Sequence, residues 1–222
     1  MLTCADLSRS GWRHESAAPA RSTAVLDGNV VPVESIRGVL TRLYAATEEE
    51  LPHIVPEERA YVAAEMTAFL LAWLSSLRCA VLNRPTPSSL CGPNWSAERW
   101  LGEGARAGLR IEPWRRVLPP YVEAAGAATP PAGVTPAIEA TAATSVVTLV
   151  GQHHWSALDD EPLEPSTLAG VRRLAGAAKV ELLTATFVGE PGARRLASAV
   201  PWVEPTHPEI ADALLERLER AS

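Results

Sequence analysis

The stretch that decides the fold runs from residue 56 to residue 108 and reads PEERAYVAAEMTAFLLAWLSSLRCAVLNRPTPSSLCGPNWSAERWLGEGARAG. Apolar residues recur every three or four positions in its first part, which predicts an amphipathic helix, and Pro56 suits the first turn of that helix. The apolar run CAVL then predicts a short buried strand. In order, the pattern predicts a helix, a strand, a Pro/Ser/Gly loop and a second helix over residues 56–77, 79–82, 83–93 and 95–107.

One acidic residue interrupts the apolar stripe of the first helix. Glu65 follows Tyr61 by four residues and precedes Phe69 by four, so it falls on or beside the face that we expect to be buried. An isolated buried carboxylate is costly, and a cationic partner is therefore expected, with Arg42 and Arg84 as the candidates. The alternative is a glutamate at the edge of the helix whose carboxylate reaches water.

The loop after the strand collects polar groups at a place where ligands commonly bind. In open α/β sheets, ligands lie at the carboxyl ends of the strands, and this loop begins there. Asn83, Arg84 and Ser89 are the loop residues that we expect to contact a ligand, with Arg42 and Glu65 as a supporting pair. A rigid structural turn, stiffened by its prolines, is the competing interpretation.

The rest of the chain predicts alternating strands and helices. Asp27-Gly28 between two β-branched runs predicts a hairpin over 23–33, whereas 35–44 fits either a helix or a strand. Residues 119–144 hold five prolines among alanine and threonine, a composition typical of a linker. Beyond it, strands are predicted over 145–150 and 180–188, helices over 165–178 and 208–218, and a strand or an irregular return over 194–202. The fold class is therefore α/β, with a partly parallel sheet flanked by helices.

Composition argues against several classes of protein. The 222 residues carry a net charge of −6 and a pI near 5.4, which disfavours nucleic acid and anionic membranes as partners. No apolar run reaches the length of a membrane span, and the N-terminus lacks the pattern of a secretory signal. The three cysteines form no CxxC pair, so neither a disulfide framework nor a zinc site is indicated. We therefore expect a cytoplasmic protein, in which Lys179 is the only lysine.

Two adjacent histidines are candidate metal ligands. His153 and His154 precede Asp159 and Asp160, and imidazole and carboxylate together suit several divalent ions. Adjacent side chains of a strand point to opposite faces, however, so both histidines could bind one ion only in an irregular loop. The favoured interpretation is a set of polar loop residues and no metal.

The block around the first helix resembles a known family. The sequences AEMTAFLLAWLSSLRCAVLNRPTPSSLCGPNW (64–95) and ARAGLRIEPW (105–114) are similar to the pre-ATP-grasp region of ATP-grasp ligases of the peptide-maturase and glutathione-synthetase-like type. In that family, a helix with an internal glutamate leads to a strand that ends in an Asn-containing loop. Glu65 and Asn83-Arg84-Pro85 occupy these places here. The resemblance implies an ATP-grasp-like architecture and a role in peptide or natural-product modification.

The C-terminal part resembles the closing segment of the same enzymes. In those enzymes a strand, a helix and a leucine-rich strand precede a final helix, and residues 145–151 and 170–218 follow this order. The resemblance divides the chain into a pre-ATP-grasp-like α/β domain (1–118), a Pro/Ala-rich linker (119–144) and a C-terminal α/β segment (145–222).

The chain departs from the pattern that catalysis would need. ATP-grasp enzymes clamp the nucleotide between two subdomains, with lysines on its phosphates and an acidic pair with an asparagine on magnesium. In this chain the linker stands where the nucleotide-binding subdomain would lie, and the segment RRLASAVPW (194–202) holds no acid and no asparagine. Phosphoryl transfer depends on positioning and on charge neutralisation, so little catalysis would remain.

These departures favour a truncated, degenerate ATP-grasp-like protein without ligase activity. It would need no cofactor, and it would bind a peptide, a small molecule or a partner protein as an accessory subunit. A divergent carboxylate-amine ligase that uses ATP and magnesium, with arginines in place of lysines, is the alternative. A structural subunit of a hetero-oligomer is a second alternative.

Overall fold

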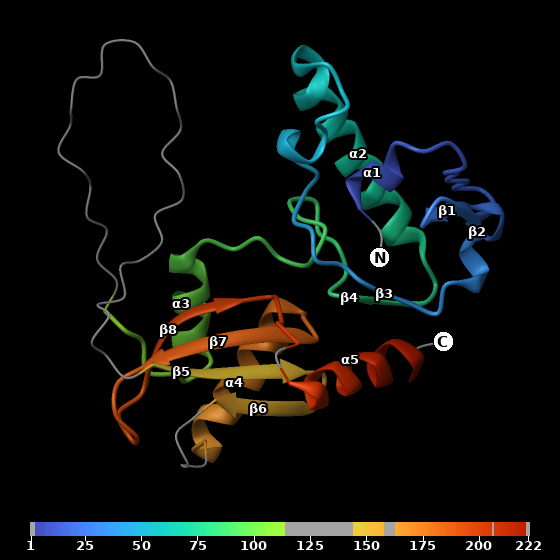
Figure 1. Cartoon of the computed structure of the whole chain (residues 1–222). Coiled ribbons are helices and arrows are strands. Elements are labelled where there is room, and N and C mark those ends of the chain that lie inside the picture. The colour runs from blue at the N-terminus through green and yellow to red at the C-terminus, as the bar shows by residue number, and fades with distance from the viewer. Residues whose placement is uncertain (1–2, 114–143, 158–162, 206, 221–222) are drawn as a thin grey trace, which may run out of the picture.

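The chain folds into a mixed α/β architecture, in which an N-terminal part lies beyond one end of a four-stranded sheet (Figure 1). The computed structural model describes residues 3–113, 144–157, 163–205 and 207–220. Their helices and sheets, one of them parallel, confirm the expected fold class. The predicted linker lies almost entirely outside the described residues, so the division into domains stays a prediction. Among the described helices, none is long and apolar enough to cross a membrane.

The N-terminal part is built from short elements. β1 (Thr23–Leu26) and β2 (Asn29–Pro32) pair as the predicted antiparallel hairpin. Asp27 (φ 49°) and Gly28 (φ 78°) adopt the left-handed conformation that a two-residue hairpin turn requires. Short helical segments accompany the hairpin: α1 Cys4–Leu7, η1 Pro19–Arg21, η2 Val33–Ser35 and η3 Glu48–Glu50.

The long helix and the strand after it form as predicted. α2 (Pro56–Ser76) ends shortly before β4 (Ala80–Leu82), and Trp73 of α2 is buried in one core with Val81 of β4. β3 (Gly38–Leu40) lies parallel to β4, so the segment that fitted either a helix or a strand is a strand. Pairing with a strand some forty residues away decides its conformation, and no local pattern carries that information.

The C-terminal part is an antiparallel sheet in the order β6-β5-β7-β8. Its strands are β5 Thr144–Val150, β6 His153–Ala157, β7 Leu182–Val188 and β8 Arg195–Val200. The helices α3 (Ala97–Arg106) and α4 (Pro165–Ala178) share a core with the sheet, which buries Val147 and Phe187. Arg194–Trp202, predicted as a strand or an irregular return, thus contains a strand.

The two parts of the chain share a core around β4. α5 (Pro208–Arg220) runs beneath the β3–β4 pair (Figure 1). Leu82 of β4 is buried in one cluster with Ile210 of α5 and Leu182 of β7. β4 therefore packs against α2 through Val81 and against α5 through Leu82, and its carboxyl end meets the start of β7.

Candidate functional site

The loop after β4 is anchored by Asn83, whose side chain is 3% exposed. Its Nδ2 donates hydrogen bonds to the carbonyls of Leu182 (3.0 Å) and Pro201 (3.2 Å). Its Oδ1 accepts from the N–H groups of Glu181 (2.8 Å) and Leu182 (3.0 Å). Both amide hydrogens and both acceptor positions are therefore in use. The residue that was expected to contact a ligand instead ties β4 to the C-terminal sheet.

Ser89, the second residue expected to contact a ligand, faces protein atoms. It is 2% exposed, and its Oγ accepts a hydrogen bond from the N–H of Cys91 at 3.3 Å. The backbones of Thr86 and Ser89 exchange two hydrogen bonds (2.8 and 3.1 Å), and Leu90 N–H donates to the carbonyl of Tyr44 at 2.8 Å. This part of the loop matches the competing interpretation of a rigid structural turn.

The predicted pair of Arg42 and Glu65 does not form. Glu65 is exposed on α2, which corresponds to the alternative of a glutamate that reaches water. Arg42 instead donates to both carboxylate oxygens of Glu204, at 2.9 Å each, and its guanidinium lies 5.1 Å from the centre of the Trp202 ring. The pairing was predicted because a buried carboxylate would need a cationic partner, and Glu65 is not buried.

Arg42 belongs to a surface cluster that joins the two parts of the chain. Trp202 Nε1 donates to Glu204 at 2.6 Å, and the ring of Tyr44 stacks on that of Trp202 with centroids 6.0 Å apart. The hydrogen bond from Trp202 and the charge of Arg42 lower the pKa of the Glu204 carboxyl. The cluster fixes the segment after β3 to the segment after β8.

The histidine pair lies in a regular strand and not in the irregular loop that a shared ion would need. His153 and His154 are consecutive in β6, so their side chains point to opposite faces. His153 Nε2 lies 3.9 Å from Glu216, and Asp159, the third candidate, falls outside the described residues. In the described ranges, no group of three or more His, Cys, Asp or Glu side chains comes together.

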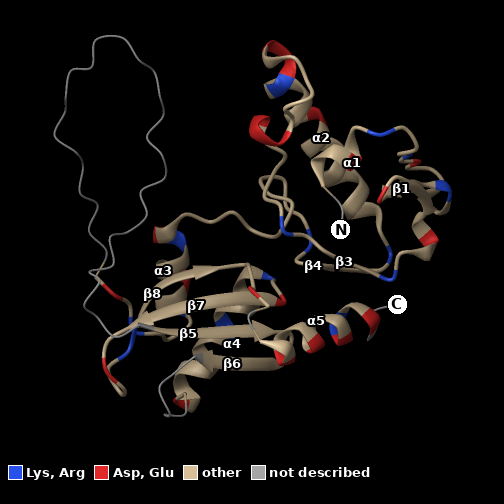
Figure 2. Cartoon of the chain, in the orientation of Figure 1, with Lys and Arg blue, Asp and Glu red and all other residues tan. Residues whose placement is uncertain are grey.

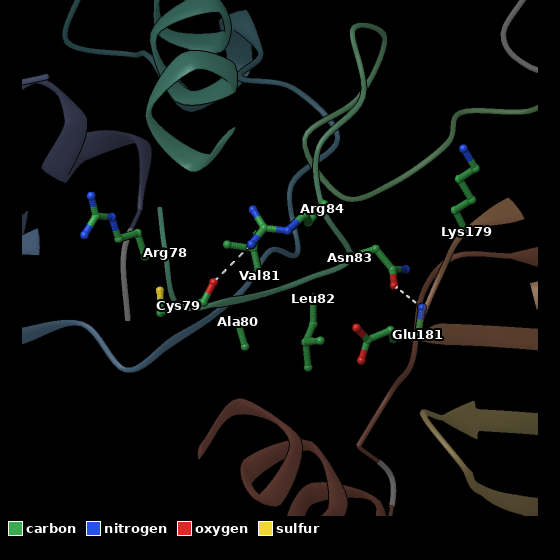
Figure 3. Close-up of a pocket in the computed structure, with 9 residues that line it drawn as sticks. All are labelled: Arg78, Cys79, Ala80, Val81, Leu82, Asn83, Arg84, Lys179 and Glu181. Carbon is green, nitrogen blue, oxygen red and sulfur yellow. Dashed lines mark hydrogen bonds between the residues drawn. The ribbon is translucent and has the colours of Figure 1, made fainter. Parts of the chain in front are cut away.

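A cavity of about 230 Å³ lies beside β4 (Figure 3). Every residue from Arg78 to Arg84 lines it, and Lys179 and Glu181 complete the wall. Successive side chains of a strand point to opposite faces, so a cavity on one face would be lined by alternate residues. In Figure 3, Ala80 and Leu82 point toward α5 and Val81 points to the other side. The cavity therefore runs along the edge of β4.

The cavity is cationic. Arg78, Arg84 and Lys179 are all exposed, and none of them forms an ion pair within the part of the chain that the structure describes. The acid of the wall, Glu181, is paired with Arg217. Figure 2 shows basic segments at both ends of the β3–β4 pair. An anionic group that entered the cavity would meet positive charge that the protein itself does not neutralise.

Sequence reasoning found part of this lining and missed the rest. Asn83 and Arg84 line the cavity, whereas Ser89, Arg42 and Glu65 do not. The sequence did not single out Arg78 and Lys179, which also line the cavity and which each stand near the end of a helix and beside a strand. What brings Lys179 to β4 is the hydrogen bonding of Asn83 to the start of β7, which no local pattern encodes.

The closing strands carry no metal-ligating acid. β7 reads LLTATFV and β8 reads RLASAV. Thr184 and Thr186 of β7 and Ser198 of β8 are their only polar uncharged residues. Hydroxyl groups are weak ligands for magnesium compared with carboxylates, and Mg²⁺ sites normally include one or two carboxylates.

Comparison of the structure with solved structures finds two macrocyclases from Microcystis aeruginosa MRC. The macrocyclase MdnB is 15% identical with a TM-score of 0.56, over 89% of this chain and 77% of that chain. The macrocyclase MdnC, solved with the precursor peptide MdnA bound, is 11% identical with a TM-score of 0.62, over 95% and 87%. No family model and no curated sequence matches. The chain therefore shares its overall fold with these two macrocyclases.

This likeness supports the resemblance that the sequence suggested, at the level of architecture. Identities of 11% and 15% carry no information on activity or on individual site residues. Whether the middle of the fold is missing from this chain stays a prediction.

Proposed function

We propose that this protein is a non-catalytic, ATP-grasp-like binding protein that takes an acidic peptide segment at the cavity beside β4, as an accessory component of peptide modification. The observation that carries the proposal is the set of unpaired cations, Arg78, Arg84 and Lys179, around one cavity of a chain whose net charge is −6. Such a local reversal of charge attracts anions that the rest of the surface repels.

We propose that the protein is non-catalytic because of the composition of its closing strands, β7 and β8. An ATP-grasp ligase would need acidic ligands for magnesium and cations on the phosphates. Neither β7 nor β8 contains an acid, and the only lysine lies at the cavity beside β4. Positioning and charge neutralisation together supply most of the catalysis of phosphoryl transfer, so a chain without these ligands would be left with binding alone.

The similar solved structures support the choice of a peptide as the proposed ligand. Both are macrocyclases, and MdnC was solved with its precursor peptide. A related architecture in this chain makes a peptide a reasonable ligand class, and the charge of the cavity selects acidic peptides within that class.

Calorimetry tests the proposal in two titrations. We expect no heat of binding with Mg-ATP up to about 1 mM, and saturable binding of a synthetic heptapeptide that alternates glutamate with valine. The same peptide with lysine in place of glutamate is the control and should not bind. Micromolar binding of Mg-ATP, or release of ADP when the peptide is supplied, would instead support the divergent ligase.

A further inference from the structure

We propose that the peptide adds to the open edge of β4 as an extended strand and places an apolar side chain in a second cavity beyond Cys79. This inference rests on the proposed function, because it specifies how the acidic peptide is held. It adds to that proposal a binding mode, a second contact region and the length of the peptide segment that pairs with β4.

The backbone of β4 has one edge without a partner strand. β3 pairs with β4 through the registers Gly38–Ala80, Val39–Val81 and Leu40–Leu82, and Thr41 N–H donates to the carbonyl of Leu82 at 3.1 Å. In a parallel ladder, alternate residues of a strand turn their N–H and C=O toward the same neighbour. Because Leu82 faces β3, the N–H and C=O of Val81 face the opposite edge.

The cavity lies along that edge, as its continuous lining already indicates. No other strand pairs with β4 in the described segments of the chain. The guanidinium of Arg84 lies over the edge and donates to the carbonyl of Cys79 over a long 3.4 Å (Figure 3). An exposed side chain held by one long hydrogen bond can be displaced at little cost. Unpaired strand edges are templates for a further strand.

A second cavity of about 330 Å³ continues the groove. It shares Arg78 and Cys79 with the first cavity, so the two adjoin at the start of β4. Most of the accessible surface of its wall is apolar, from Pro19, Ala20, Val33 and Ile36, and the polar residues Glu34, Arg37 and Ser76 also line it. The groove therefore offers an apolar pocket at one end and cations toward the other.

These features define the occupant. β4 (Ala80–Leu82) spans about 10 Å at roughly 3.3 Å per residue, so its edge matches about three residues of an added strand, and the flanking peptide residues would lie along the rest of the lining. Main-chain hydrogen bonds would supply affinity that does not depend on sequence, and alternate side chains would supply specificity. The occupant that fits is an extended acidic segment with an apolar residue that reaches the pocket at Val33 and Ile36.

The experiment uses the full chain and the fluorescein-labelled Glu/Val heptapeptide, read by fluorescence anisotropy and by amide hydrogen exchange. We expect exchange of the Val81 amide to slow by at least about tenfold when the probe is bound, because its N–H gains an acceptor. Two N-methylated probes give an independent test. Methylation of one alternating set of peptide amides should weaken binding by about tenfold or more, and methylation of the other set should leave it unchanged.

A charge reversal localises the site. Arg84→Glu should weaken probe binding by roughly tenfold, whereas the control Arg106→Glu, on α3 and outside the lining, should leave it within about twofold. Binding of the probe with no protection of Val81, or equal effects of both methylation patterns, overturns strand addition and leaves the proposed function standing. Failure of the probe to bind at all overturns both.

Discussion

Replacement of Asn83 by alanine is expected to destabilise the protein far more than an ordinary loop substitution. The side chain is buried, and its four hydrogen bonds join residues 98 to 118 positions apart in sequence. Alanine leaves the N–H groups of Glu181 and Leu182 and the carbonyls of Leu182 and Pro201 without these partners. A buried polar group left unsatisfied costs about 1–3 kcal/mol.

The size of the expected loss in the free energy of unfolding depends on how many of those backbone groups water cannot reach. Leu182 is buried, whereas Glu181 is partly exposed, so water can reach part of the vacated site. We therefore expect a total loss of about 4 kcal/mol in the free energy of unfolding, less than the full sum of four penalties. For a domain of this size, that corresponds to a fall in Tm of about 8–16 °C.

Urea denaturation measures this loss, and the exposed Asn94 gives a matched control. Asn94→Ala should change the free energy of unfolding by less than about 0.5 kcal/mol. Asn83→Asp keeps an acceptor for the two N–H groups but sets a carboxylate against the carbonyls of Leu182 and Pro201. Its deficit should therefore narrow as the pH falls and the carboxyl becomes a donor. A loss for Asn83→Ala no larger than that of Asn94→Ala would refute the tethering role.

Three further predictions concern packing, thiol chemistry and the long helix. Gly170→Ala would place a Cβ 2.4 Å from Leu109 Cδ2 and should lower the free energy of unfolding by about 1–3 kcal/mol. In the same helix, the Cβ of Gly176→Ala meets nothing within 4 Å, so this control should raise the free energy of unfolding by about 0.4–1 kcal/mol. Equal shifts in Tm for the two variants would contradict this packing. Cys79 is partly exposed, whereas Cys4 and Cys91 are buried, and burial raises the pKa of the Cys79 thiol. Maleimide should therefore label Cys79 slowly near neutral pH and faster as the pH rises above the ordinary thiol pKa. Labelling that persists in Cys79→Ser would show that another cysteine reacts. Glu65→Ala should change stability by less than about 0.5 kcal/mol in thermal melts, and a loss near 3 kcal/mol would return Glu65 to a buried ion pair.

The elements that sequence predicted are those with a strong local signal. The helix that begins at Pro56 has a long apolar-rich run that starts at a favourable proline and buries Leu70, Trp73 and Leu74, and the hairpin has an Asp27-Gly28 turn whose backbone conformation those residues favour. β3 lacked such a signal, because its apolar residues fit helical and extended spacing equally. Its conformation follows from pairing with β4.

The site was harder to predict than the fold because its parts come from distant segments. Asn83 and Arg84 were predicted to contact a ligand, and both line the cavity, but the side chain of Asn83 is a buried tether. The expected burial of Glu65 suggested that Arg42 would pair with it, although the partner of Arg42 is Glu204, 162 residues away. Contacts over that separation depend on how the C-terminal sheet docks, which the helix pattern does not contain.

The C-terminal part determines what remains available on β4. Leu82 packs on Ile210 and the other buried residues of α5, and Val81 packs in the cluster of α2, so both faces of the strand are covered. β3 takes one edge through its parallel register. The other edge keeps the only backbone groups of β4 that a peptide could reach, and Asn83 holds Lys179 and the start of β7 beside it. The tether and the proposed binding edge are therefore one arrangement, and a change that loosens Asn83 should also move the cations away from the groove.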